Sequence, residues 1–345
     1  MAPVRILIVS QMWPGPADPD LGGFVATIAG QLEGLGHTVD LAVINHRGGS
    51  RRKYPRLCLD AVRMARRHRP DVVFAHMLFP AGLAGAAASM LGRAPLVVMA
   101  HGADVANLGR VPGVTTLTRA VLRRASGLIV NSAWLARQLD AFVPGSAARA
   151  HVIDCGVDLD RFRPVAAAPA RGELGWGADG PALLCVGSLI PRKNVVALAD
   201  AFAQLGRGSL AFVGDGPLRP ELDGRPGVRL VGRIPHADVA RWIAACDVLC
   251  QPSVREPFGQ AALEAMAMAR SVVATADGGP AEFVTPDAGL LVAPGDHGAL
   301  RNALVAAAAL PSPNHAARAV AERHGARLQA TRMAAVLRAA VDERA

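Results

Sequence analysis

Aromatic residues are scarce in this sequence of 345 residues, and only one of them is a tyrosine. No stripe of aromatic side chains runs among the basic residues, so the stacking surfaces typical of nucleic-acid-binding proteins are missing. The five cysteines are an odd number and show neither a CxxC nor a zinc-like spacing. We therefore expect no nucleic-acid partner and reduced core cysteines at Cys58, Cys155, Cys185, Cys246 and Cys250.

Long apolar runs are also absent. The N-terminal run RILIVS is too short for a signal peptide and is followed at once by polar and proline residues. No run approaches the roughly 20 apolar residues that are needed to span a bilayer. We therefore expect a cytoplasmic protein. Because 51% of the residues are hydrophobic in a chain long enough for two cores, we also expect two packed domains.

Acidic residues are nearly missing from the segment 45–69. It holds nine basic residues against the single acid Asp60, so its net charge is 9 − 1 = +8, whereas the whole chain carries +9. One interpretation is a surface for an anionic acceptor or for peripheral contact with an acidic inner membrane face, where each cation gains about 1 kcal/mol. An equally supported interpretation is a solvated loop and helix in an arginine-rich proteome. The basic residues are Arg47, Arg51, Arg52, Lys53, Arg56, Arg63, Arg66, Arg67 and Arg69.

Short apolar runs alternate with amphipathic stretches along the chain, which is the pattern of βα units and parallel sheets. The segment after Pro164, VAAAPARGELGWGADG, has little pattern and is interpreted as a linker. We therefore predict an α/β protein with two Rossmann-like, doubly wound domains facing a cleft, 1–165 and 178–325, and with ligands at the carboxyl ends of strands. The expected strands are 5–10, 38–44, 72–75, 96–100, 127–131 and 151–154, then 182–187, 210–214, 228–232, 248–252, 271–275 and 289–292.

Two glutamates eight positions apart stand out in the second half. Glu256 precedes Pro257, which suits the first position of a helix, so we predict a helix from Pro257 to about Ala269 with Glu256 as its cap. Glu264 then lies two turns inside, roughly 12 Å from Glu256 along the axis. A hydrolytic carboxylate pair needs about 5 to 10 Å, so this spacing favours gripping two ends of an elongated ligand.

The same helix start predicts an anion site between the two acids. Free backbone N–H groups are expected at Phe258, Gly259 and Gln260, and the glycine lets a ligand approach the backbone. An acid, an anion site and a second acid together match a nucleotide sugar, with its sugar hydroxyls, diphosphate and ribose hydroxyls.

Other candidates are weaker when taken alone. Gly22 and Gly23 open a helix after the first strand, where N–H groups could face an anion, although such glycines often only make a turn. His101 ends a strand, but a lone histidine is more often structural. Two D-x-D pairs, Asp18 with Asp20 and Asp158 with Asp160, are interpreted as turn acids, so no metal site is expected.

A further phosphate-binding candidate begins the second domain. Gly187 ends a strand and Lys193 precedes a helix, so the lysine can reach phosphates. A Walker A motif fails, because Arg192 and Asn194 occupy positions that need glycine and serine or threonine. A dinucleotide fingerprint fails as well, because Arg219 stands where its third glycine is required.

These motifs together resemble one family. EPFGQAALEAMA followed by VVATADGG resembles the E-x7-E signature of the retaining GT-B glycosyltransferases of the family 4, or glycosyl transferases group 1, type. HGAD, HVIDCGVDLDRFRP, GSLIPRKN and VGRIPHADV resemble further stretches of the same family, so the resemblance covers nearly all of the chain. Cys155 stands where the family often has asparagine, and Ser188 where it often has arginine. One phosphate charge is then left unpaired, or Arg192 compensates.

The resemblance implies a retaining glycosyltransferase of the hexosyltransferase type, active in carbohydrate biosynthesis. It would move a sugar from a nucleoside diphosphate sugar to an acceptor hydroxyl without metal or cofactor, and the leaving diphosphate would help to take the acceptor's proton. The C-terminal helix, about 326–345, would pack back on the first domain. The implied catalytic residues are His101, Glu256 and Lys193, and the implied donor-binding residues are Gly22, Gly23, Gly187, Ser188, Arg192, Lys193, Arg233, Ile234, Glu256, Phe258, Gly259, Gln260 and Glu264.

Two other functions stay open at this point. The first is a different enzyme on the same architecture, such as a nucleotide-sugar epimerase or a phosphorylase. The second is a non-catalytic protein that binds a sugar nucleotide or a polyanion. The motifs name neither the base nor the sugar of the donor, and the acceptor could be a sugar, a lipid-linked intermediate or a small molecule.

Overall fold

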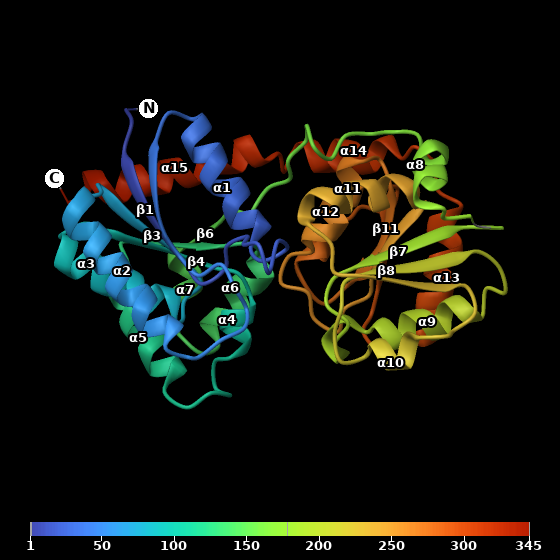
Figure 1. Ribbon diagram of the computed structural model, residues 1–345, viewed down its shortest axis with the longest axis horizontal. Coiled ribbons are helices and arrows are strands. Elements are labelled where there is room, and N and C mark those ends of the chain that lie inside the picture. Colours follow the sequence, from blue (N-terminus) through green and yellow to red (C-terminus); the bar gives the residue numbers. More distant parts are fainter. Residues whose placement is uncertain (1, 178, 345) are drawn as a thin grey trace. The chain divides into compact units, whose positions relative to one another are not determined.

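A computed structural model describes residues 2–177 and 179–344 and divides the chain into two compact units. Unit 1 comprises the described residues of Met1–Gly156 and of Ala326–Ala345, and unit 2 comprises those of Val157–Gly325. The chain thus leaves unit 1, forms all of unit 2 and returns to unit 1 with its last helix (Figure 1).

Unit 1 is built on a parallel six-stranded sheet with the strand order β2-β1-β3-β4-β5-β6. Its strands are β1 (Arg5–Ser10), β2 (Thr38–Val43), β3 (Val72–His76), β4 (Leu96–Ala100), β5 (Gly127–Val130) and β6 (Ala150–Val152). Its helices are α1 (Gly23–Gly34), α2 (Lys53–His68), α3 (Ala81–Gly92), α4 (Ala103–Ala106), α5 (Val114–Arg124), α6 (Ala133–Asp140), α7 (Ser146–Arg149) and α15 (Ala326–Asp342).

Helices cover both faces of this sheet, which explains why its strands are almost continuously apolar. Ile6 and Ile8 of β1 pack in a core with α1 and α15, whereas Leu7 and Val9 pack in a second core with α2 and α3. Figure 1 shows α1 and α15 on one side of the sheet and α2, α3 and α5 on the other. The last helix contacts α1, β3, β4 and β5.

Unit 2 repeats the architecture with the strand order β12-β11-β10-β7-β8-β9, again all parallel. Its strands are β7 (Ala182–Val186), β8 (Ser209–Val213), β9 (Val228–Gly232), β10 (Val248–Gln251), β11 (Ser271–Thr275) and β12 (Gly289–Val292). Its helices are α8 (Ala167–Leu174), α9 (Val195–Ala203), α10 (Arg219–Leu222), α11 (His236–Ala245), α12 (Gln260–Ala267), α13 (His297–Ala308) and α14 (His315–Glu322), with the short 3-10 helices η1 (Pro191–Lys193) and η2 (Gly279–Glu282).

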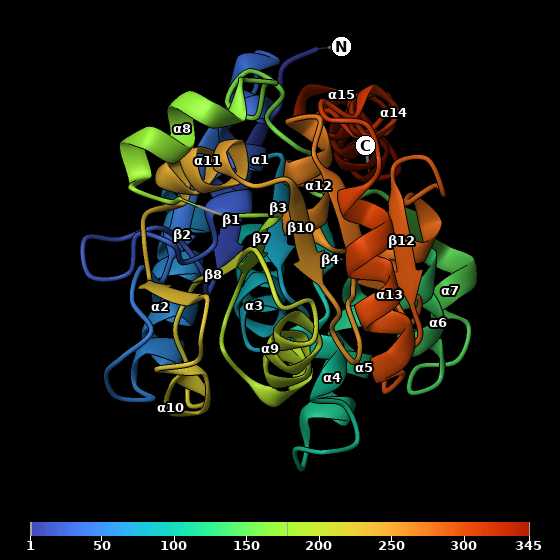
Figure 2. The ribbon, with the colours of Figure 1, turned by 90° about the vertical axis from the view of Figure 1, so that its right-hand side faces the viewer.

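The two faces of the second sheet are also both buried. Leu184 of β7 belongs to a core with α11, α12 and α14, and the next residue, Cys185, belongs to a core with α9, α10 and α13. Figure 2 shows α13 beside β12, with which it is in contact. The two sheets confirm the predicted α/β fold with two Rossmann-like domains.

The twelve predicted strands are all present, five of them with the predicted bounds and the others within one or two residues at either end. The predicted linker is wrong. Eight of its residues, Ala167–Leu174, form α8, and Trp176 is buried at 2% exposure against Trp242, with ring centroids 5.5 Å apart. The units therefore separate between Gly156 and Val157 rather than after residue 165.

Two further observations concern the cysteines and the helices. All five cysteines are free thiols, and four of them are buried. Over the described ranges, 2–177 and 179–344, no helix combines the length and the apolar character that crossing a bilayer requires.

Candidate functional site

Glu256 is positioned by a backbone bridge to the loop after β11. Its N–H donates to the carbonyl of Asp277 at 3.3 Å, and its carbonyl accepts from the N–H of Gly279 at 2.8 Å. A Cβ on Gly278 would overlap the Glu256 carbonyl, so only glycine permits this close approach. The bridge holds Glu256 in an extended conformation beyond the end of β10.

The predicted cap at Glu256 is therefore wrong. The N-cap is Gly259, which has φ 100°, and α12 begins at Gln260 rather than at Pro257 and ends at Ala267. The rule that places proline at the first helical position failed because the bridge to Gly278 keeps the chain extended at Glu256. The predicted separation of roughly 12 Å between Glu256 and Glu264 along one helix axis is therefore wrong as well, because Glu256 lies outside the helix.

Three donors converge on one oxygen of the Glu256 carboxylate. Oε2 accepts from Lys193 Nζ at 2.6 Å, from Ser253 Oγ at 2.9 Å and from Gln251 Nε2 at 3.2 Å. The amide of Gln251 must turn its nitrogen to Glu256, because an ionised carboxylate only accepts. In the described part of the chain no donor reaches Oε1.

The charge of Glu256 depends on these partners. Its carboxyl group is buried, and burial alone would raise its pKa, but the Lys193 ammonium, with Arg192 and the Ser253 hydroxyl, lowers the pKa overall. Glu256 is therefore a buried, ionised carboxylate whose charge is neutralised chiefly by Lys193.

Lys193 reaches Glu256 from the turn after β7. That turn passes Gly187 and ends in η1, and Lys193 is its last residue. The Lys193 side chain lies beside Gly187, where an added Cβ would meet Cε at 3.6 Å. Arg192 turns to the loop before Glu256 instead and donates to the carbonyl of Arg255 at 3.0 Å, while Ser188 is exposed.

Glu264 lies on α12 and is 3% exposed. Its Oε1 receives His236 Nε2 at 2.9 Å and Gln260 Nε2 at 3.4 Å. His236 begins α11, and the Glu264 charge is the main reason that its pKa is raised above its ordinary value, with burial opposing. The structure therefore adds a histidine to the predicted acid.

The other predicted donor residues of unit 2 surround these two acids in sequence but differ in exposure. Arg233 is exposed, and Ile234 packs partly into the core that contains α11 and α12. Phe258 is buried, with its ring centroid 5.4 Å from that of Phe283. Because α12 begins at Gln260, the anion-binding N–H groups predicted at 258–260 shift to the helical turn that Gln260 opens.

In unit 1, His101 belongs to a buried polar cluster at the carboxyl ends of β3 and β4. Its Nε2 lies 3.1 Å from Nδ1 of His76, the rings stack at 5.3 Å, and its Nδ1 lies 3.7 Å from the Cys155 thiol. The carboxylate of Asp104 accepts the N–H groups of His101 and Gly102. Burial lowers the pKa of His101 to about 4, so the ring is neutral at pH 7.

Gly22 and Gly23 lie close to this histidine. Gly22 is the N-cap of α1 with φ 67°, and a Cβ there would overlap the backbone of Met12, so the turn requires glycine. Phe24, the next residue, places its ring 4.8 Å from that of His101. The start of α1 and His101 therefore form one local site in unit 1.

The aspartates of the first D-x-D pair are held by Arg47. Its guanidinium reaches Asp18 Oδ1 at 3.0 Å and both oxygens of Asp20 at 2.8 Å, and its N–H donates to Asp18 Oδ2 at 2.7 Å. Over the described residues, no group of three histidine, cysteine or acidic side chains is arranged to hold a metal ion.

Four residues of these clusters were missed from the sequence: His76, His236, Gln251 and Ser253. Each lies at or just after the carboxyl end of a strand, where sites in parallel sheets are expected. Their position could have identified them from the sequence, because polar side chains at this edge of a parallel sheet can contact a bound ligand.

Two family models match the chain, one over each half. Residues 21–161 match the model described as Glycosyltransferase Family 4, and residues 180–309 match the model described as Glycosyl transferases group 1. The D-inositol 3-phosphate glycosyltransferase 1 of Catenulispora acidiphila is 33% identical over 238 residues, which cover 61% of this chain and 56% of that protein. The putative teichuronic acid biosynthesis glycosyltransferase TuaC of Bacillus subtilis is 28% identical, with 68% and 60% covered. The chain thus spans little more than half the length of these relatives.

Solved structures share the whole fold. Sucrose-phosphate synthase from Thermosynechococcus elongatus superposes with a TM-score of 0.81 at 25% identity, covering 97% of this chain and 98% of that chain. Anabaena HepE, solved in complex with UDP-glucose, superposes with a TM-score of 0.77 at 23% identity, covering 97% and 100%. At this identity, the likeness to HepE shows the fold.

Proposed function

We propose that this chain, which belongs to the family 4 glycosyltransferases of the group 1 type, transfers a sugar from a nucleoside diphosphate sugar to an acceptor hydroxyl. The observation that supports this most is the Lys193–Glu256 pair at the end of β7 and β10, with Glu264 on the helix that follows. The two buried carboxylates belong to the segment that carries the family signature, and the cation that pairs with Glu256 comes from the stretch after β7. A nucleoside diphosphate sugar offers one anion and two sets of hydroxyls to such groups.

In the proposed reaction, the bond between the anomeric carbon and the diphosphate oxygen breaks, and a bond from the acceptor oxygen to that carbon forms on the same face. The acceptor proton passes to the leaving diphosphate. The described partners of the Glu256 carboxylate are a lysine, an amide and a hydroxyl, and we assign the role of base to the diphosphate itself. The anomeric configuration is thereby retained.

The residues of the chain contribute by binding and by charge. Lys193 and the start of α12 stabilise the negative charge that develops on the diphosphate, and Gly22 with Gly23 adds a second helix start. Glu256 orients the sugar and stabilises its oxocarbenium-like charge, while Glu264 holds the ribose. His101, neutral at pH 7, supports the transferred sugar without adding charge. We propose that the transfer needs no metal ion and no cofactor besides the donor.

The first test is donor binding. We expect one of UDP, GDP, ADP and TDP to stabilise the protein by roughly 2.7 kcal/mol at about 100 times its dissociation constant, because only the folded state binds it. The stabilisation should be the same with and without magnesium. Thermal unfolding with each nucleotide, at two salt concentrations, measures both.

A Glu264→Ala protein is the matched variant for this test. Its stabilisation by the nucleotide should fall well below that of the wild type, and Glu221→Ala, an exposed glutamate of α10, should leave it unchanged. A response that follows only salt would instead indicate a polyanion binder. Turnover of the donor without an acceptor, or only with inorganic phosphate, would indicate the epimerase or the phosphorylase.

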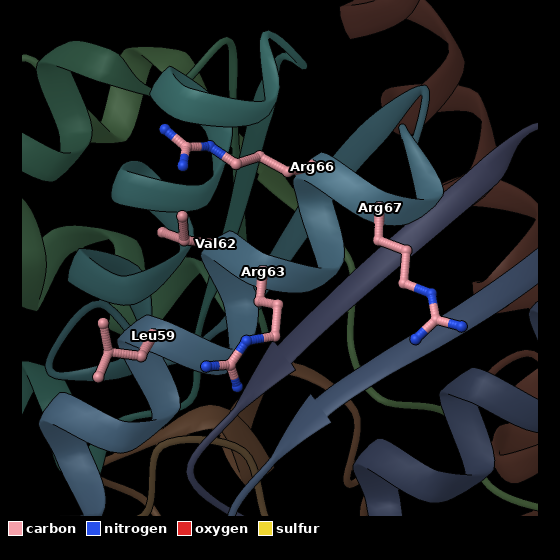
Figure 3. Close-up of a pocket in the computed structure, with 5 residues that line it drawn as sticks. All are labelled: Leu59, Val62, Arg63, Arg66 and Arg67. Atoms are coloured by element: carbon pink, nitrogen blue, oxygen red, sulfur yellow. The ribbon is translucent and has the colours of Figure 1, made fainter.

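We also propose that α2 brings the protein to an anionic membrane surface. Leu59 is 64% exposed on this helix, and Met90 of the adjoining α3 is 63% exposed. With Leu59, three arginines of α2 line a shallow hollow of about 430 Å³, and Figure 3 shows them spread along the helix: Arg63, Arg66 and Arg67. Arg63 also pairs with Asp60 at 3.2 Å, and the apolar side chains among these cations fit an acidic bilayer better than a purely polar anion.

This proposal predicts vesicle binding. Cosedimentation with phosphatidylglycerol-containing vesicles should weaken about a hundredfold when Arg63, Arg66 and Arg67 are all changed to glutamine, since each cation near the surface contributes about 1 kcal/mol. The control changes the exposed Arg207, Arg301 and Arg327 to glutamine and so removes the same total charge. If both triple variants bind alike, α2 is not the contact surface.

A further inference from the structure

One oxygen of the Glu264 carboxylate already accepts hydrogen bonds from within the protein. Both of its donors, His236 Nε2 and Gln260 Nε2, reach Oε1, and in the described part of the chain no donor reaches Oε2. A carboxylate held in this way cannot rotate freely, because turning it would break both hydrogen bonds. Oε2 is therefore the oxygen that a ligand would meet.

His236 is itself held from three sides. It is the first residue of α11, its ring centroid lies 5.8 Å from that of Phe162, and its Nδ1 lies 3.5 Å from Nη1 of Arg161. Its side chain is 25% exposed, whereas that of Glu264 is 4% exposed. The histidine therefore separates a buried acid from solvent and fixes it at 2.9 Å.

Three charged groups act on His236: Glu264, Arg161 and Asp158. Glu264 of α12 faces Nε2, and Arg161 faces Nδ1. Asp158 forms an ion pair with Arg161, in which Asp158 Oδ2 lies 3.9 Å from Arg161 Nε. Nε2 donates to Glu264 whether the ring is neutral or protonated, and in the neutral form Nδ1 can accept from Arg161. The contact to Glu264 thus persists across neutral pH.

We propose that His236 is a positioning residue for nucleotide recognition, which holds Oε1 of Glu264 and so presents Oε2 to the cis-diol of a ribose. The proposal rests on the proposed function and adds a residue to it. It assigns His236 no contact with the nucleotide of its own. Removing His236 should therefore weaken only the part of the binding that passes through the ribose hydroxyls.

The test compares two ligands on four proteins. Calorimetry measures the dissociation constant of the nucleoside diphosphate that stabilises the wild type and that of its 2′,3′-dideoxy counterpart. We expect His236→Ala to bind the ribonucleotide about tenfold more weakly, the loss of roughly one good hydrogen bond, and the dideoxynucleotide within about twofold of the wild type.

Two amides serve as matched variants. Glutamine places its Nε2 close to the position of the histidine Nε2, so His236→Gln should keep most of the preference for ribose. Asparagine is one methylene shorter and cannot reach Oε1 from the same backbone position, so His236→Asn should behave as alanine does. The ratio of the two dissociation constants is used, because it does not depend on the fraction of folded protein.

Each remaining outcome overturns the proposal. Equal weakening for both ligands in His236→Ala would show a merely structural histidine, and no weakening for either ligand would show that Glu264 needs no support. A wild type that binds the ribo and dideoxy forms equally would remove Glu264 from the ribose while leaving the proposed function standing. A wild type that binds none of the nucleotides would overturn both.

Discussion

A Glu256→Gln protein is expected to lose about a hundredfold in kcat while its dissociation constant for the donor changes by less than about threefold. Glutamine keeps the size of the side chain and an oxygen for Lys193 and Ser253 to donate to. It removes the negative charge, which is needed most when the sugar becomes oxocarbenium-like. The effect should therefore fall on turnover and not on binding.

The small change expected in the dissociation constant for the donor follows from the positions of the other proposed nucleotide contacts. Glu264 and His236 are on α12 and α11, and the start of α12 is formed by Gly259 and Gln260. None of these residues bonds to the Glu256 carboxylate, and Lys193, which does, keeps its ammonium, so the nucleotide should still be held. A variant that lost binding and turnover equally would show that Glu256 contributes to ground-state binding instead.

Steady-state kinetics with the donor identified by thermal unfolding, together with calorimetry, give the two quantities separately. Glu221→Gln is the control, because this glutamate of the same unit is exposed and outside the proposed site. A Glu256→Ala protein that transferred sugar at the wild-type rate would remove Glu256 from the mechanism.

The strands were predictable because their signal is local. Ile6 to Val9 are buried on both faces of the sheet, so the run must be apolar whatever surrounds it. The α/β architecture follows from the alternation of such runs with amphipathic stretches. Each strand can therefore be recognised from its own short segment of sequence.

The cap and the linker were not predictable, because distant residues decide them. Glu256 stays extended through its bridge to Gly278, and α8 is held by Arg171, which donates to Asp247 at 2.6 Å and to the carbonyl of Ala245 at 2.7 Å. Neither partner is near in sequence. Local propensity is a weak prior that such tertiary contacts override.

The site also has features that the local sequence predicts and features that distant residues decide. That Lys193, Glu256 and Glu264 belong to one site was predicted from their motifs, but the motifs do not show that Lys193 and Glu256 neutralise each other across 63 positions. The His236–Glu264 contact spans 28 positions and two helices. Such pairs are set by the topology that brings the carboxyl ends of strands to one edge, and a single sequence contains no measure of that distance.

A Lys193→Met protein is expected to lose about 3 kcal/mol of the stability of unit 2, together with binding of the diphosphate. The side chains of Lys193 and Glu256 are 14% and 9% exposed, so removing the ammonium leaves a buried carboxylate with only Ser253 and Gln251 as donors. Breaking a buried ion pair from one side typically costs about 3 to 5 kcal/mol, because an uncompensated charge is left behind. Native-state hydrogen exchange in β7 and β10 measures the loss within unit 2 alone.

The double variant Lys193→Met with Glu256→Gln distinguishes the cost of leaving one buried charge without its partner from the effect of removing both charges. With no charge left to bury, it should regain roughly 2 kcal/mol over Lys193→Met, although neither donor binding nor turnover returns. The pH dependence gives a second check. With Lys193 gone, burial should raise the pKa of Glu256 above its unfolded value, so the deficit is present at neutral pH and shrinks as the carboxyl group becomes protonated on acidification.

In the wild type the sign is opposite. The lowered pKa of Glu256 makes its contribution to stability present at neutral pH and lost as the pH falls through that pKa. The stability curves of the wild type and of Lys193→Met should therefore converge toward acidic pH. Parallel curves would mean that Glu256 is not the charge that Lys193 neutralises.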